Sequence, residues 1–282
     1  MGNYIEIDSN KCVGCGICVD ECPCSCLIIK DQKAVLKENN TCLSCGHCGS
    51  VCSKNAIVST YIGRKHFSIS NFDNTLSPEQ LLFCKKRSVR TFSTNEINND
   101  SLYKLVEFAE KAPSAENLRN RKYFILNSEE QIKHVISCIQ NEYKKLILLL
   151  NPVTLGIIKI FNKDYYHELE QLVSVSKKLV LKESNKDYIF RDSHCIVCIA
   201  APERSLFSRD DCIGAQHYMM LYGKTINIDS FIVGFAQSEH KKIEHILHIP
   251  KGYSIYAISA FGYSKYDYLR DIKYTVPDIV FY

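Results

Sequence analysis

Two cysteine runs with the same spacing, near the beginning of the chain, constrain its fold more than any other feature. Each run reads C-x2-C-x2-C-x3-C, and the second begins 30 residues after the first. The runs are Cys12, Cys15, Cys18 and Cys22, followed by Pro23, and then Cys42, Cys45, Cys48 and Cys52. The flanking apolar residues repeat as well, because Ile5 and Val35 each precede a first cysteine by seven residues. The repeat predicts two equivalent halves, each a strand, a ligand loop, a short helix and a strand.

The spacing has a chemical explanation. Three thiolates at two-residue intervals can surround one cuboidal iron–sulfur cluster, while the fourth, one helical turn further on, ligates the other cluster. The predicted ligand sets are therefore Cys12, Cys15, Cys18 and Cys52 for one cluster, and Cys42, Cys45, Cys48 and Cys22 for the other. Zinc is the alternative metal, but zinc sites use two separated C-x2-C pairs around one ion. We therefore favour iron–sulfur clusters.

Over about residues 1–60 the chain resembles the bacterial two-[4Fe–4S] ferredoxins. It departs from them at Ser53, where proline is usual. Cys24 and Cys26, in the same stretch, are interpreted as small apolar packing residues, and a redox pair is the alternative. His47, which lies between two ligands, is interpreted as a solvent-facing or hydrogen-bonding neighbour rather than as an iron ligand.

The cysteine content also bears on the compartment. Ten of the 15 cysteines precede residue 53, whereas a disulfide scaffold is typically a short secreted chain with a signal peptide. The first residues contain neither a basic nor a long apolar segment. The longest apolar stretch, 146–161, is interrupted and shorter than the roughly 20 residues of a membrane span. We expect a cytoplasmic protein, and its net charge of +4 does not favour a nucleic-acid partner.

The chain beyond the cysteines predicts a second, larger domain. Residues 61–78 lack apolar periodicity and are rich in Ser, Asn and Asp, which is typical of a linker. Residues 79–282 mix helical patterns with strands, and the apolar run 195–200 predicts a central strand that is buried on both faces. The expected fold class is α+β, with a two-cluster domain over 1–60 and an α/β sandwich over 79–282 that has helices on both sides of its sheet.

Three local patterns in the larger domain suggest a bound cofactor. Residues 86–92, KRSVRTF, place cations and a hydroxyl close together, which suits a phosphate and an electron-rich ring edge. The alternative for this pattern is a solvated basic run. Residues 112–117, APSAEN, close a helix with small residues and an amide that can bond a planar heterocycle. Residues 261–265, FGYSK, are followed by Arg270 and Lys273.

In this order, and together with segments 211–216, 246–253 and 278–282, these patterns resemble the FMN-dependent nitroreductase family over about residues 80–282. The resemblance implies an FMN enzyme that is a homodimer. It departs from the family at Lys86, where arginine is usual, and at Arg119-Asn120, which replace Gln-Pro. The FMN contacts that it implies come from Lys86, Arg87, Ser88, Arg90, Pro113, Ser114, Asn117, Val233 and Gly234, with Lys265, Arg270 or Lys273 at the phosphate.

The combined expectation is an oxidoreductase. The clusters relay single electrons to FMN, which reduces a small organic acceptor of the nitroaromatic, quinone or flavin type, and Arg90 and Asn117 are the expected catalytic residues. Arg90 is expected near the pyrimidine side of the ring. The donor is a ferredoxin or a ferredoxin-reducing oxidoreductase, with NAD(P)H as a variant. The alternative function is an electron-transfer module that serves a protein partner and has no small substrate.

One further segment, 141–188, begins with an apolar stretch. We interpret it as a helical arm that covers the flavin or clasps the partner subunit. A helix on a membrane surface is the alternative, although we expect no membrane partner.

Overall fold

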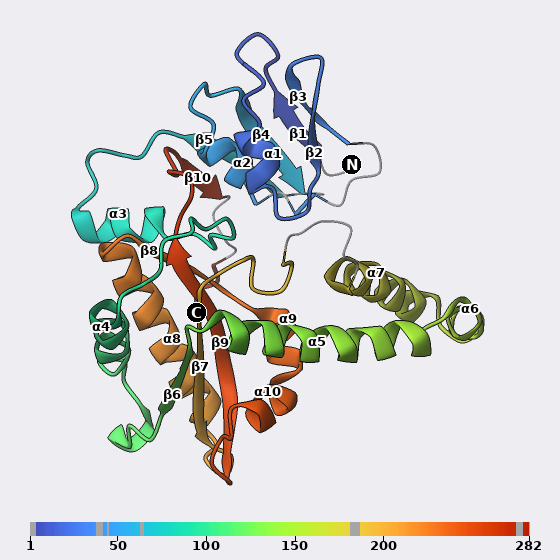
Figure 1. Ribbon diagram of the computed structural model, residues 1–282. Coiled ribbons are helices and arrows are strands. Elements are labelled where there is room, and N and C mark those ends of the chain that lie inside the picture. Colours follow the sequence, from blue (N-terminus) through green and yellow to red (C-terminus); the bar gives the residue numbers. More distant parts are fainter. Residues whose placement is uncertain are drawn as a thin grey trace. The chain divides into compact units, whose positions relative to one another are not determined.

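The computed structural model describes residues 4–37, 42–43, 45–62, 65–180, 187–274 and 279–281 (Figure 1). Asp278 and Tyr282, in the last segment of the family resemblance, lie outside these residues. Contacts divide the chain into two compact units. We call Met1–Thr91 together with Ser264–Tyr282 the cysteine unit, and Phe92–Tyr263 the core unit.

The cysteine unit contains an antiparallel sheet of order β1-β4-β5-β10 and a separate hairpin, β2-β3. Its strands are β1 (Tyr4–Ile7), β2 (Leu27–Lys30), β3 (Lys33–Leu36), β4 (Ile57–Ile62), β5 (Lys65–Ser70) and β10 (Asp271–Tyr274). Its helices are α1 (Ile17–Glu21), α2 (His47–Ser50) and α3 (Pro78–Lys85). Helix α3 begins with a capping box between Ser77 and Gln80, which satisfies backbone donors that have no partner within the helix.

The two halves of the cysteine repeat share their backbone geometry. Gly16 and Gly46 directly precede α1 and α2, and both are left-handed, with φ of 80° and 72°. Ser25 and Asn55, also 30 residues apart, are left-handed as well, with φ of 52° and 51°. The period that is visible in the sequence is therefore a period of the backbone.

The structure differs from the predicted linker over residues 61–78. Strand β5 lies within that range and pairs with β10 from the far end of the chain, with Asp271 opposite Ser70 and Tyr274 opposite Phe67. Without β10, β5 would be an unprotected edge of the sheet. The cysteine unit consequently extends to Thr91 and takes in residues after Tyr263, whereas the sequence predicted a domain that ends at residue 60.

The core unit is built on an antiparallel sheet of order β6-β7-β9-β8. Its strands are β6 (Lys122–Leu126), β7 (Cys195–Pro202), β8 (Ile228–Ile232) and β9 (Tyr253–Tyr263). Its helices are α4 (Asn99–Ala109), η1 (Ala115–Asn117, a 3-10 turn), α5 (Glu129–Leu149), α6 (Pro152–Phe161), α7 (Lys163–Val180), α8 (Ser208–Thr225), α9 (Gly234–Ser238) and α10 (His240–Ile246).

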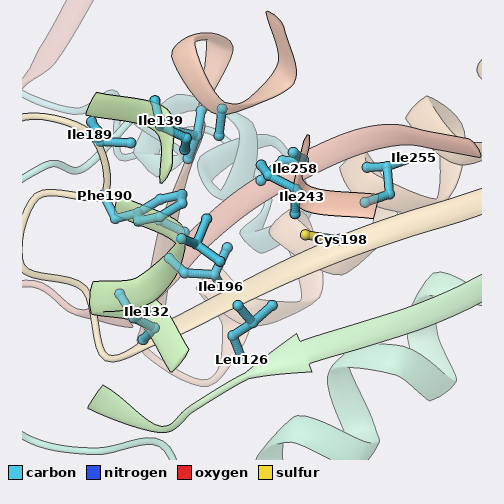
Figure 2. Close-up of a cluster of buried hydrophobic side chains, with 14 of the residues drawn as sticks. Leu126, Ile132, Ile139, Ile189, Phe190, Ile196, Cys198, Ile243, Ile255 and Ile258 are labelled. Atoms are coloured by element: carbon cyan, nitrogen blue, oxygen red, sulfur yellow. The ribbon is translucent and has the colours of Figure 1, made fainter. Parts of the chain in front are cut away.

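Strand β7 divides the core into two apolar layers because successive side chains of a strand point to opposite faces. Val197 packs with residues of α4 and α8 on one face. On the other face, Ile196 and Cys198 pack with Phe190 and with residues of α5 and α10 (Figure 2). The predicted central strand is buried on both sides, and the α/β sandwich with helices on both faces is confirmed.

The segment 141–188, which was predicted as a helical arm, contains the end of α5 and all of α6 and α7, and its residues 181–186 lie outside the description. The buried side chains of α5 lie between Ile132 and Tyr143, and α7 packs against α5. Helix α6 has no buried residue, and its Ile160 and Phe161 are more than four-fifths exposed. In the described part of the chain, no helix combines the length and the apolar content that a membrane span requires.

Removal of the Phe190 ring tests the apolar core of the core unit. Phe190 is fully buried, so Phe190→Ala should lower the free energy of unfolding by about 3–5 kcal/mol, through lost burial and the cavity that remains. Urea unfolding followed by tyrosine fluorescence measures the change. Leu206→Ala, at a side chain that is 91% exposed, is the control and should shift the free energy by less than about 0.5 kcal/mol. Equal effects of both variants would contradict the described core.

Candidate functional site

Two cavities in the cysteine unit are bordered by cysteines from both runs. The first is bordered by Cys12, Cys15, Cys18 and Cys52. The second is bordered by Cys22, Cys42, Cys45 and Cys48, and also by Cys24. Each cavity thus takes three thiols from one run and the fourth from the other, and these groups contain the two predicted ligand sets. Within the described residues, no three His, Cys, Asp or Glu side chains are gathered to hold a single ion.

Backbone amides donate to sulfur atoms at equivalent positions of the repeat. The Cys26 amide donates to Cys22 Sγ at 3.2 Å, and the Ala56 amide donates to Cys52 Sγ at 3.4 Å. A further amide, that of Ala34, donates to Cys12 Sγ at 3.3 Å. Amide donors of this kind stabilise negative charge on the sulfurs of iron–sulfur clusters. The thiol sets and their donors fit the chemistry of cluster ligands.

Burial sets the acidity of these thiols. It raises the pKa of Cys18 to about 11, and the neighbouring thiols of Cys52, Cys15 and Cys12 add to the shift. Burial likewise raises the pKa of Cys48 well above its usual value and that of Cys45 to about 11, although the positive charge of Arg90 acts on Cys45 in the opposite direction. A cation must therefore replace the proton before these sulfurs carry charge at neutral pH.

The other residues of the cysteine loops have distinct places. Cys26 is packed in the apolar cluster of this unit, at the position equivalent to Ala56. Cys24 packs against the same cluster, as the packing interpretation expected, and it also borders the second cavity. His47 is buried, and its Nδ1 lies 3.3 Å from Glu21 Oε1. His47 is thus a polar neighbour of a buried carboxylate.

Four of the predicted FMN contacts lie in one loop of the cysteine unit. Arg87 Nη2 forms an ion pair with Asp271 Oδ1 at 2.8 Å, and Lys86 Nζ donates to the Arg87 carbonyl at 2.7 Å. Arg90 Nη1 donates to the Ser88 carbonyl at 3.1 Å. Arg87 Nε is buried and has no hydrogen-bond partner among the described residues. This loop concentrates cationic donors and a hydroxyl, which fits an anionic, carbonyl-rich cofactor.

The predicted phosphate-binding residues also contact other parts of the cysteine unit. Lys265 Nζ lies 2.8 Å from Asp20 Oδ2 and is half exposed. Arg270 is 5% exposed, and its guanidinium donates to the carbonyls of Gly49 and Cys52 and to Asn55 Oδ1. The donors of Arg270 that the structure describes are therefore directed at the second cysteine run. Lys273 is exposed on β10.

The remaining predicted contacts lie in the core unit. In the turn after α4, Ser114 Oγ accepts from the Arg119 amide at 3.1 Å, and Asn117 Oδ1 accepts from Arg119 Nε at 3.0 Å. Pro113 is exposed. Val233 is buried, and its amide donates to the Ile258 carbonyl at 3.0 Å. Gly234, the first residue of α9, is exposed, and a Cβ there would meet nothing within 4 Å.

Two residues that position this turn were not identified from the sequence. Asp211 Oδ1 accepts from the Ala115 amide at 3.0 Å. The buried Arg121 donates to the carbonyls of Ala112 and Asp211. The sequence analysis used the segment with Asp211 only for the family resemblance and assigned Arg121 no role, so only these hydrogen bonds reveal both residues.

Gly14 provides a test of the first cavity. Comparison with the nearby Gly16 separates a steric clash of an added Cβ from the backbone strain at positive φ. Gly14 and Gly16 both have positive φ, but a Cβ on Gly14 would lie 2.2 Å from the Gln32 carbonyl oxygen, whereas one on Gly16 would meet nothing within 4 Å. Gly14→Ala should therefore lose iron after anaerobic purification, while Gly16→Ala, which bears only the backbone strain of about 1–2 kcal/mol, should retain more. Equal iron content in the two variants would contradict the close approach of the loop to β2-β3.

Comparison with known proteins gives matches for both parts of the chain. The nitroreductase family matches residues 85–263, and a 4Fe-4S binding domain matches residues 3–23. Ferredoxin-2 of Desulfomicrobium norvegicum is 49% identical over 35 residues, which are 12% of this chain and 59% of that protein. The chain therefore spans about three-fifths of the length of this relative.

Solved structures with a similar fold include two nitroreductases with bound FMN. The Bacteroides fragilis protein has a TM-score of 0.51 and 14% identity, over 67% of this chain and 89% of its own. The Desulfitobacterium hafniense protein has the same TM-score and identity, over 74% of this chain and 100% of its own. Iodotyrosine deiodinase bound to FMN and 3-iodo-L-tyrosine, at 15% identity and a TM-score of 0.51, covers 72% of this chain and 97% of its own.

At these identities the solved structures establish the fold, and the family match carries the classification. That match covers more than half of the chain and includes the sheet of the core unit. The predicted family and the predicted ferredoxin-type segment are both confirmed. The chain belongs to the nitroreductase family of oxidoreductases and carries a ferredoxin-type 4Fe-4S binding segment ahead of the family domain.

Proposed function

We propose that this protein is an FMN-dependent oxidoreductase in which two [4Fe–4S] clusters relay single electrons to FMN for the reduction of a small organic acceptor. The clusters supply one-electron transfer, and FMN couples single electrons to a two-electron reduction with proton uptake. The proposed ligand sets are those that border the two cavities. The acceptor classes that we propose are nitroaromatics, quinones and flavins.

One observation carries this proposal: the loop with Lys86, Arg87, Ser88 and Arg90 belongs to the same compact unit as the two cavities that the eight cysteines border. By family resemblance Arg90 lies near the pyrimidine side of the flavin, where a fixed positive charge stabilises the anion that forms on reduction. The positive charge of Arg90 also opposes the rise in the pKa of Cys45, a proposed ligand of the second cluster. This coupling supports a relay in which the second cluster is the one that serves the flavin.

The roles of the other residues follow from their donors. Lys86, Arg87 and Ser88 supply cationic and hydroxyl donors from the loop, and the unsatisfied Arg87 Nε supplies one more. Asn117 supplies an amide, and the Gly234 segment supplies backbone close to the reactive edge. For the phosphate we propose Lys265, which is half exposed, with Lys273 as the other candidate. We assign Arg270 no part in holding the phosphate, because its donors are engaged elsewhere.

The surface beside the ligand loops supports a protein as electron donor. Val13 and Leu43 each follow the first cysteine of a run, and they are 57% and 59% exposed. Exposed apolar side chains at equivalent positions offer a small contact surface to a redox partner. We therefore propose a ferredoxin, or an oxidoreductase that reduces one, as the donor, with NAD(P)H as the variant. We further propose a homodimer, as the family resemblance implies.

Anaerobic stopped-flow mixing tests the proposed function. With reduced ferredoxin as donor, the broad iron–sulfur absorbance should bleach before or together with the flavin bands, and a nitro compound should then reoxidise the flavin. If NADH or NADPH reduces the flavin while the iron–sulfur absorbance does not change, the relay is wrong. If only a protein, and no small molecule, reoxidises the flavin, the electron-transfer module is the function. A protein that is colourless after anaerobic purification would contradict both.

Arg90→Ala tests the residue on which the proposal depends. Loss of the guanidinium removes a fixed charge from the flavin site, so flavin content or the rate of flavin reduction should fall at least about tenfold. Flavin absorbance after gel filtration and single-turnover reduction measure the two quantities. Arg204→Ala, at an exposed arginine of the core unit, is the matched control and should leave both unchanged. Wild-type values in Arg90→Ala would exclude the assigned role.

A further inference from the structure

Residues 264–274, which we call the strap, follow the family domain and return to the cysteine unit. The strap ends in β10, which completes the sheet beside β5. Its Ile272 is buried, and its Asp271 forms the ion pair with Arg87. The strap is thus a built part of the unit that contains both cysteine cavities.

The strap forms hydrogen bonds with residues at equivalent positions in both halves of the repeat. Asp20 and Ser50 are 30 residues apart, and each lies two residues before the fourth cysteine of its run. Asp20 Oδ2 accepts from Lys265 Nζ at 2.8 Å and from Tyr266 Oη at 2.7 Å. The Ser50 carbonyl accepts from the Leu269 amide at 2.9 Å, and Ser50 Oγ donates to the Arg270 carbonyl at 2.9 Å.

The fourth cysteines, Cys22 and Cys52, are the residues that each run contributes to the cavity of the other run. Their backbone decides whether both ligand sets can be complete at once. Tyr268 extends the same pattern, because its hydroxyl donates to the buried carboxylate of Glu21, directly before Cys22. The strap therefore fastens the chain at the two places where the halves exchange ligands.

Arg270 is the charged centre of the strap. Its guanidinium is buried and donates to the carbonyls of Gly49 and Cys52 and to Asn55 Oδ1. All three acceptors are neutral oxygens. The carboxylate of the next residue, Asp271, is paired with Arg87 instead. A full positive charge is consequently buried against the main chain of a proposed cluster ligand, where the low dielectric strengthens its effect.

We propose that Arg270 is a positioning residue that holds Cys52 and, through its buried charge, raises the reduction potential of the cluster that Cys52 ligates. The proposal rests on the two-cluster function proposed above. Net charge and hydrogen bonding around a cluster set its potential. A positive charge favours the reduced cluster, which is the more negative form. The strap is thereby a tuning element that a ferredoxin-type segment alone does not contain.

The test is a redox titration of the full-length protein, followed by electron paramagnetic resonance, with iron content measured in parallel. Arg270→Gln removes the charge and should lower the midpoint potential of one cluster by about 59 mV or more, which is a tenfold change in the one-electron equilibrium constant. Lys30→Gln removes the same charge from an exposed position on β2 of the same unit and should leave both potentials unchanged. Arg270→Lys keeps the charge and should retain most of the wild-type potential.

Asn55→Asp keeps the proposal testable if Arg270→Gln loses its iron. This change retains an acceptor for Arg270 Nη1 but places a carboxylate beside the guanidinium, so the potential should fall in the same direction. If Arg270→Gln keeps its full iron content and both potentials are unchanged, the inference is wrong. If Arg270→Gln holds no iron, the same result in Asn55→Asp would overturn the inference. Either result would leave the proposed function intact. A wild-type protein without iron–sulfur signals would overturn the proposed function and this inference with it.

Discussion

The exchange of one thiol between the two cysteine runs is the constraint on which the cysteine unit depends. Each cavity takes its fourth thiol from the other half of the repeat, so neither half can complete a ligand set alone. Helices α1 and α2 must therefore lie in contact, and the loops before them must turn through left-handed glycines. Burial disfavours the free thiolates, so in the proposed metal-bound protein the amide donors and the metal would together offset the cost of burying them.

The parts of the structure that local sequence encodes were the parts that could be predicted. Cysteine spacing grouped the thiols as the cavities do, because the fourth cysteine of each run lies one helical turn beyond the third and is directed away from the other three. The unbroken apolar run of β7 was sufficient to predict a central strand, because a strand that is covered on both faces shows a continuous apolar run instead of alternating apolar and polar residues. Motifs in a fixed order were sufficient to identify the family.

Contacts between distant segments could not be predicted in this way. Strand β5 was read as a linker because its partner, β10, lies about 200 residues further along the chain. Arg270 was one of three candidates for the phosphate, and a basic residue in a tail carries no sign of the carbonyls to which it donates. The sequence likewise gave no sign that Asp211 holds the turn at Ala115. In each case a partner from a remote element decides the role of the residue.

Arg90 and Arg270 each act on a different proposed cluster. The charge of Arg90 reaches Cys45, of the second ligand set, and Arg270 holds the main chain of Cys52, of the first. Arg270 is more deeply buried than Arg90, and a buried charge acts more strongly than one that water screens. In the proposed relay, the first cluster would then have the higher potential and hold an electron, while the second would pass electrons to the flavin. Together the two proposed clusters would hold the two electrons that a flavin needs for one two-electron reduction, which gives the first cluster a purpose beyond lengthening the relay.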